Sequence, residues 1–153
     1  MKKAHTIAAG VVLAAAVAGG WYVYADQGEG EQAVAAGVLS LERGRELYLA
    51  QCASCHGRNL EGQGDWRTTL PDGTFPAPPH DETGHTWHHP DAMLFAYTKL
   101  GGAAMAGGRF ESGMPAFGDV LSDAEIIAVL DYIKSTWPAE VRQRQASIDA
   151  GDR

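Results

Sequence analysis

The feature that most constrains the fold is a long stretch, residues 57–89, that shows neither helical nor strand periodicity. It holds Pro71, Pro76, Pro78 and Pro79, together with four glycines after Gly57. A segment of this length without regular structure is uncommon inside a compact domain. It becomes reasonable if the segment wraps something large that supplies the missing apolar core. We therefore expect a loop-rich domain whose apolar core is completed by a large bound group.

Helical patterns flank this stretch. Gly44, Leu47 and Tyr48 recur at helical spacing before it, and residues 90–99 predict a shorter helix after it. Near the C-terminal end, Ser122 and Glu125 have the spacing of a capping box ahead of an amphipathic helix. The apolar face of that helix consists of Ile126, Val129, Leu130, Ile133 and Trp137. The predicted fold class is all-α, with about three to five helices joined by long loops.

The missing partner is indicated by Cys-Ala-Ser-Cys-His at residues 52–56, which is the attachment pattern for c-type haem. Two thiols at this spacing on one helical turn, Cys52 and Cys55, can add to the two vinyl groups of the porphyrin. His56 is then placed to bind the iron from one side. A zinc site would need four ligands, and the chain has no second cysteine pair. A thioredoxin-like pair would need a βαβ pattern around it. We expect one covalent haem c.

The second axial ligand has several candidates. Met114 is favoured, because the Gly-Met-Pro turn at residues 113–115 can present a thioether to the iron from an extended loop. Met93 lies in an apolar helical pattern and is expected in the core. Met105 lies among alanines and glycines, which suit packing. A histidine from residues 80–89 remains the other alternative.

With these residues in view, the chain resembles a class I, single-haem bacterial cytochrome c over roughly residues 39–137. The matching parts are Gly44 and Tyr48 ahead of the haem motif, and the segments 52–57, 113–118 and 121–137. The resemblance implies a small cytochrome c fold whose first and last helices cross near the haem.

The resemblance also implies roles for single residues. Gly44 would lie at the crossing, against Val129 and Tyr132, with the Tyr132 ring over the contact. The carbonyl of a proline after the haem motif would accept the Nδ1 proton of the ligating histidine, and both Pro78 and Pro79 match that position. Trp87 resembles the tryptophan that donates to a haem propionate, although a plain core position explains it nearly as well.

Four histidines within residues 80–89 depart from the family pattern: His80, His85, His88 and His89. The plainest interpretation is a polar loop whose rings bond to propionates, backbone or water. A histidine at the haem edge could instead tune the potential with pH. Imidazoles also suit copper and zinc, so a separate metal site is the third interpretation.

The ends of the chain predict its location. Residues 6–25 are uncharged and follow a basic start, which fits either a cleaved signal peptide over residues 1–25 or an uncleaved membrane anchor. Either reading places the rest outside the cytoplasm, in the periplasm. Residues 26–38 read as a flexible tether, 39–138 as the cytochrome c domain and 139–153 as a polar tail.

We expect a one-electron carrier rather than an enzyme, because two protein ligands leave the iron no open position for a substrate. Its partners would be redox proteins of a respiratory or other electron-transfer chain, and it could be the haem subunit of a larger membrane oxidoreductase. A net charge of −7 excludes nucleic acid as a natural partner. Two alternatives remain: an open iron that handles peroxide or a small gas, and a sensor or copper-handling module that uses the histidines.

Overall fold

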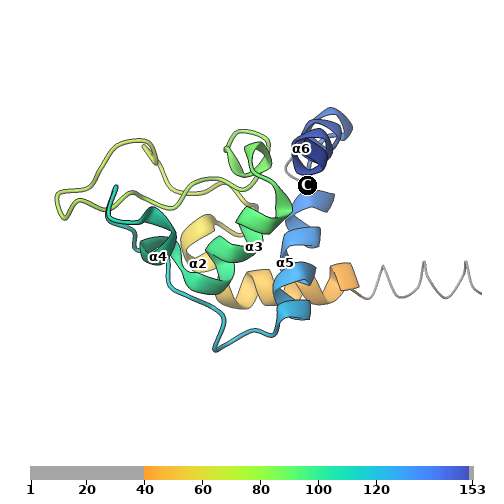
Figure 1. Ribbon diagram of the computed structural model, residues 1–153, viewed down its shortest axis with the longest axis horizontal. Helices are drawn as coiled ribbons and strands as arrows, with labels where there is room; N and C mark the ends of the chain where they lie inside the picture. Colours follow the sequence, from red (N-terminus) through yellow and green to blue (C-terminus); the bar gives the residue numbers. More distant parts are fainter. Residues whose placement is uncertain (1–39, 152–153) are drawn as a thin grey trace, which may run out of the picture. The chain divides into compact units, whose positions relative to one another are not determined.

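The computed structural model describes residues 40–151, and the regular elements in this part are helical (Figure 1). They are a helix over residues 40–51, α2 (Ala53–His56), the 3-10 helix η1 (Thr86–His88), α3 (Asp91–Leu100), α4 (Gly102–Ala106), α5 (Asp123–Ser135) and α6 (Ala139–Gly151). The prediction of an all-α fold with long loops is confirmed. The leader or anchor over residues 1–25 and the tether over 26–38 lie outside the described residues.

The helix over residues 40–51 crosses α5, and a glycine lies at the contact (Figure 1). A β-carbon added to Gly44 would lie 2.0 Å from the Ala128 carbonyl oxygen and 3.1 Å from the Tyr132 β-carbon. The crossing therefore requires a residue without a side chain. The resemblance implied Val129 at this point, but the backbone that approaches Gly44 most closely belongs to Ala128. Val129 faces the core instead, with 2% of its surface exposed.

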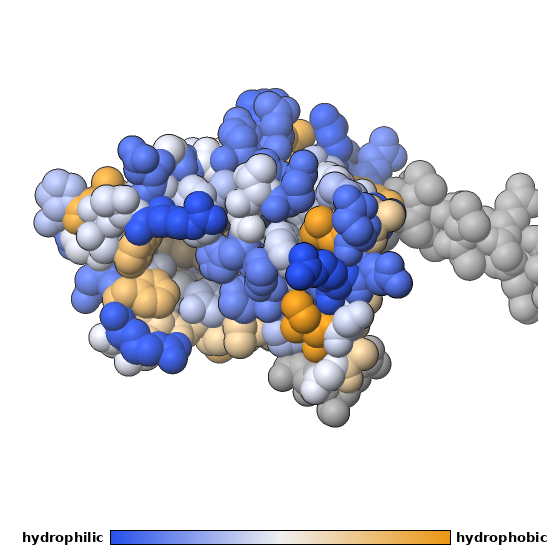
Figure 2. Space-filling model, turned by 90° about the horizontal axis from the view of Figure 1, so that it is seen from above, coloured by the Kyte–Doolittle hydropathy of each residue, from blue (hydrophilic) through white to orange (hydrophobic). Residues whose placement is uncertain are grey.

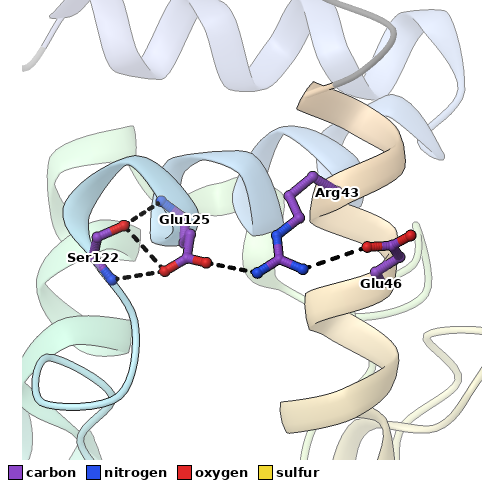
Figure 3. Close-up of polar contacts among 4 residues, drawn as sticks. All are labelled: Arg43, Glu46, Ser122 and Glu125. Carbon is purple, nitrogen blue, oxygen red and sulfur yellow. Dashed lines mark hydrogen bonds and ion pairs between the residues drawn. The ribbon is translucent and has the colours of Figure 1, made fainter.

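Polar contacts hold the outer ends of the same two helices together (Figure 3). The Arg43 guanidinium donates to Glu125 Oε1 at 2.8 Å and to Glu46 at 3.4 Å. Glu125 also completes the capping box of α5: the Ser122 backbone donates to its carboxylate, and its own N–H donates to the Ser122 hydroxyl. The predicted capping box is confirmed.

One apolar cluster lies between the haem motif and α5. Its members include Tyr48 and Leu47 from the first helix, Ala53 within the motif, Leu60 after it, and Phe117, Leu121, Ile126, Val129, Ile133 and Trp137. Cys52, Trp87, Met114 and Tyr132 pack against this cluster as partly buried side chains. Trp137 is 1% exposed but lies beyond the end of α5, which stops at Ser135.

The short helix predicted over residues 90–99 is present as α3, which begins after Pro90. Its buried side chains are Leu94 and Thr98. Met93 was expected in the core, but its side chain lies on the outer face and the residue is 39% exposed. The error arises because the apolar residues of this helix are not confined to one face.

The long loop extends away from the helices in Figure 1, beside the segment that follows α4. Thr74 and Glu111 pair there in an isolated bridge, and the rings of Phe75 and Phe110 meet edge to face with centroids 5.9 Å apart. Within the loop, Leu60 and Asp65 have positive φ angles of 66° and 52°. These contacts give residues 57–85 a defined path without a strand or a helix.

The segment expected to be a polar tail contains α6, which packs against η1. Gln145 is 2% exposed, and its amide donates to the His89 carbonyl at 3.3 Å and to Asp91 Oδ1 at 2.7 Å. Because these contacts are polar, no apolar periodicity in the sequence indicated a packed helix. Hydrophilic residues also dominate the face seen in Figure 2, from the side on which α6 lies in Figure 1.

No helix within residues 40–151 has both the length and the apolar character needed to cross a bilayer.

Candidate functional site

The haem motif occupies the end of the first helix and one further turn, α2. The Cys52 N–H donates to the Tyr48 carbonyl at 2.9 Å, and the His56 N–H donates to the Cys52 carbonyl at 2.9 Å. Helical geometry thus continues through the motif and brings its three reactive side chains onto adjacent positions of one turn. Gly57, with φ of 83°, ends the helix directly after His56.

The two cysteines are thiols and do not form a disulfide with each other. Cys52 is half-buried and Cys55 is exposed. Burial raises the pKa of the Cys52 thiol to about 11, and the neighbouring Cys55 adds to the shift. A structural zinc site has four ligands, and this pair supplies two. The pair therefore fits covalent attachment better than a cysteine metal site.

The His56 ring is oriented by the backbone of the long loop. Its Nδ1–H donates to the Pro78 carbonyl at 2.9 Å, and only 8% of the residue is exposed. Burial lowers the pKa of His56, and this effect outweighs the Pro78 hydrogen bond, which raises it. The ring is therefore neutral, with its proton on Nδ1. The lone pair of Nε2 is the one that can bind a metal.

The structure distinguishes the two prolines that the sequence left open. The Pro78 carbonyl accepts from His56, whereas the Pro79 carbonyl accepts from the Thr86 hydroxyl at 3.4 Å. Gly84 also lies close to the Pro79 carbonyl, since a β-carbon there would be 2.1 Å from its oxygen. Pro79 therefore fixes the path of the loop, and Pro78 contacts the candidate ligand.

Two further residues contact this turn: Tyr48, to which the sequence assigned no role at the site, and His80, which the sequence treated only as one of four clustered histidines. The Tyr48 hydroxyl donates to the Gly57 carbonyl at 2.9 Å, and Tyr48 is fully buried. Burial raises the pKa of Tyr48, so its proton stays available for this bond. The His80 ring stacks on the His56 ring, with centroids 4.0 Å apart and planes inclined by 22°. Tyr48 was detectable, because it precedes Cys52 by one helical turn.

The remaining histidines of the cluster face aromatic rings or each other. His85 stacks on Trp66 at 5.2 Å and meets the edge of His89 at 5.4 Å, while His88 stacks on Trp87 at 3.6 Å. Within residues 40–151, no group of three or more histidine, cysteine or carboxylate residues is arranged to hold a metal ion. The described residues therefore give no support to a separate copper or zinc site in this cluster, and that interpretation stays a prediction.

Trp87 and Tyr132 lie at the edge of the apolar cluster. The Trp87 indole N–H donates to the Glu82 carbonyl at 3.3 Å, and the Arg144 guanidinium lies 5.4 Å from its ring centroid. The Tyr132 ring lies 5.6 Å from the ring of Tyr48. Trp87 as a propionate donor stays a prediction.

Met114 lies on the loop between α4 and α5. The Gly102 N–H donates to the Met114 carbonyl at 3.0 Å, and the Met114 N–H donates to the Ser112 hydroxyl at 3.3 Å. A β-carbon at Gly102 would lie only 1.9 Å from Ser112 Oγ and 3.2 Å from the Met114 β-carbon. Met105 belongs to α4, and its carbonyl accepts from Arg109 at 3.3 Å.

This donor set fits haem c. It combines two free thiols one turn apart, a neutral imidazole with Nε2 as its metal-binding nitrogen, and a thioether on a loop that packs against the same apolar cluster as Cys52. Thiols attach the porphyrin, and imidazole and thioether are ligands that cytochromes c use for the iron.

Comparison with known proteins supports this assignment. The model of the family described as Cytochrome c matches residues 41–137, which is well over half of the chain. No curated protein and no solved structure matches the chain significantly. Helix α6 lies beyond the matched residues. Family members are typically electron carriers rather than enzymes. The chain belongs to the cytochrome c family, and it transfers electrons through a haem c held covalently by Cys52 and Cys55.

Proposed function

We propose that this cytochrome carries single electrons on the outer side of the cytoplasmic membrane, and that His56 and Met114 are the axial ligands of its iron. The observation that carries the proposal is the His56 ring. It follows Cys55 directly, it is neutral, and its Nδ1 proton is engaged by Pro78 at 2.9 Å. Nε2 is thereby left as the metal-binding atom beside the attachment cysteines.

When bound, the haem supplies a one-electron iron couple. The chain tunes that couple through the proximal ligand. A histidine that donates its second N–H to a carbonyl has a fixed tautomer and ring orientation, and it is a more basic ligand. The bond from His56 Nδ1 to the Pro78 carbonyl has this form.

The distal ligand is assigned to Met114 rather than Met105. Met114 packs against the apolar cluster that also contacts Cys52. Its backbone is anchored at both groups: the Met114 N–H donates to the Ser112 hydroxyl, and the Met114 carbonyl accepts from the Gly102 N–H. Met105 lies within a helix of five residues, among Gly102, Ala103, Ala104 and Ala106, and no such loop presents it. A methionine ligand raises the potential of a cytochrome c.

Electrons would enter and leave on the side of Cys55. That side chain is exposed, whereas Cys52 is half-buried. A porphyrin edge joined to Cys55 would therefore be closer to solvent than an edge joined to Cys52. The partners are other redox proteins, met in brief encounters over a small interface.

The location rests on the N-terminal sequence. A basic start followed by uncharged residues 6–25 directs the remaining chain out of the cytoplasm. Fractionation of cells with mass spectrometry of the N-terminus tests this. Recovery in membranes that resists high salt supports an anchor, and a soluble periplasmic form that begins at Asp26 supports cleavage. A cytoplasmic, haem-free product contradicts the proposal.

The axial ligands are tested by comparing Met114→Ala with Met105→Ala. We expect Met114→Ala to keep covalent haem but to lose the weak long-wavelength band of methionine–iron ligation. It should also lower the reduction potential and allow carbon monoxide or cyanide to bind. Met105→Ala is the matched control and should change none of these. The assignment is wrong if the band survives Met114→Ala and disappears in Met105→Ala.

A further inference from the structure

We propose that His80 is a positioning residue for the proximal ligand: its ring, stacked on the ring of His56, fixes the rotation of the His56 imidazole about its bond to the iron. The inference rests on the proposed function, because it takes His56 as that ligand. It gives a specific role to one member of the histidine-rich segment.

The first step is the geometry of the stack. The two ring centroids are 4.0 Å apart and the planes are inclined by 22°, so the His80 ring covers one face of the His56 imidazole. The bond to Pro78 restrains only the Nδ1 corner of the imidazole, and a hydrogen bond tolerates a broad range of angles. A flat neighbour against the ring face removes the remaining freedom of rotation.

The second step is that His80 is itself held rigidly. Its backbone N–H donates to the Leu60 carbonyl at 2.8 Å, and its carbonyl accepts from the Trp137 indole at 2.7 Å. The Thr86 hydroxyl forms a hydrogen bond with His80 Nδ1 at 2.8 Å and also lies 3.4 Å from the Pro79 carbonyl oxygen. Backbone and ring are thus anchored by three separate parts of the fold.

These contacts form a closed series that starts and ends at His56. His56 bonds to Pro78, the adjacent Pro79 bonds to Thr86, Thr86 bonds to His80, and His80 stacks back on His56. A displaced His80 would let the imidazole turn and pull Nδ1 away from the Pro78 carbonyl. The histidine would then be a less basic ligand, and the potential would rise.

The test compares four variants of the complete, haem-loaded protein. His80→Leu removes the flat ring, His80→Phe keeps it, and Thr86→Val removes the hydrogen bond to the His80 ring while keeping a similar shape. His85→Gln is the matched control, because His85 is an exposed histidine of the same segment whose ring stacks on Trp66. The readouts are the paramagnetic shifts of the haem methyl groups, the electron paramagnetic resonance g values and the reduction potential, with thermal unfolding measured in parallel.

We expect His80→Leu to change the pattern of methyl shifts and g values and to raise the potential. His80→Phe should stay close to the unmodified protein, Thr86→Val should lie between the two, and His85→Gln should change nothing. The inference is overturned if His80→Leu retains the original pattern and potential. If His80→Leu does not fold, Thr86→Val decides: a changed pattern supports the inference and an unchanged pattern overturns it.

Failure of the proposed function shows elsewhere. It would appear in the unmodified protein, as a spectrum without a histidine- and methionine-ligated low-spin iron. Failure of the present inference appears only in the comparison between variants.

Discussion

The two candidate iron ligands are held in different ways. On the proximal side, side chains do most of the holding: the His56 ring bonds to Pro78 and stacks on His80, and Tyr48 bonds to the following carbonyl of Gly57. On the distal side, Met114 is held chiefly through its backbone.

This difference indicates how substitutions near each ligand should affect folding and ligation. The proximal contacts also form part of the buried core, because Tyr48 belongs to the apolar cluster and Trp137 bonds to His80. Substitutions at these contacts should lower the free energy of unfolding before they remove His56 as a ligand. The distal loop contacts the core mainly through Met114 and Phe117. Substitutions in this loop should therefore release the Met114 side chain from the iron while the domain stays folded.

The largest expected effect comes from removing the haem that both regions surround. Cys52→Ser with Cys55→Ser should leave little folded protein, because the long loop loses the apolar surface it wraps and buried apolar area contributes roughly 25 cal/mol per Å². Circular dichroism and yield of the purified chain measure this. Ser54→Ala, an exposed position between the cysteines, is the control and should accumulate normally. A stable, folded, haem-free double variant would contradict the expectation.

The next largest effect comes from a substitution where the first helix, which leads into the haem motif, crosses α5. Gly44→Ala places a methyl group 2.0 Å from the Ala128 carbonyl, so the two helices must separate. We expect a loss of about 3 kcal/mol in the free energy of unfolding, since both partners at the contact are backbone. The visible spectrum of the folded fraction should be unchanged. Denaturant unfolding measures the loss, and a variant as stable as the original would show that the crossing is looser than the structure has it.

The third effect tests the distal side. Gly102→Ala directs a methyl group at Ser112 Oγ, 1.9 Å away, and thereby displaces the Met114 loop. We expect a cost of about 1–2 kcal/mol and a weaker long-wavelength methionine–iron band. Gly113→Ala is the control, because a methyl group there meets nothing within 4 Å.

A second variant sharpens the distal test. Combining Gly102→Ala with Ser112→Ala removes the nearest obstructing atom, but it also removes the hydroxyl that accepts from the Met114 N–H. The Ser112 β-carbon would still lie 2.8 Å from the added methyl group, so the band should recover only in part. If Gly102→Ala leaves the band intact, or if Gly113→Ala weakens it equally, then Met114 is not held through Gly102 and the comparison between the two sides fails.

Much of the fold could be predicted because its determinants are local. The capping box at Ser122 and Glu125, the helix after Pro90 and the apolar face of α5 follow from residue spacing alone. The haem motif is equally local, since its three reactive residues lie within five positions of sequence.

The remainder depends on contacts between distant residues. The choice of Pro78 over Pro79, and the stack of His80 on His56, arise from how the long loop returns to the motif, and no local pattern encodes that path. Helix α6 escaped prediction for another reason. Its buried residue is the polar Gln145, and the packing of Val141 against the apolar cluster does not extend into an apolar stripe.

The smallest effect concerns pH and the polar link at the outer ends of the two helices (Figure 3). The Arg43 guanidinium, followed by the Ser122 bonds, holds the pKa of Glu125 below its ordinary value of 4.5. A carboxyl whose pKa is lowered by folding contributes stability above its unfolded pKa, and that stability is lost as pH falls through the folded pKa. Arg43→Gln should therefore be slightly less stable than the original near neutral pH, and the two stability curves should converge in acid.

The difference in stability between Arg43→Gln and the original should be small and should shrink in high salt, because both side chains are accessible to water. Denaturant unfolding at several pH values measures it. Arg58→Gln, which removes the same charge from another exposed arginine, is the control. Curves for Arg43→Gln that stay parallel to the original down to acid pH would show that the Ser122 cap alone sets the pKa of Glu125.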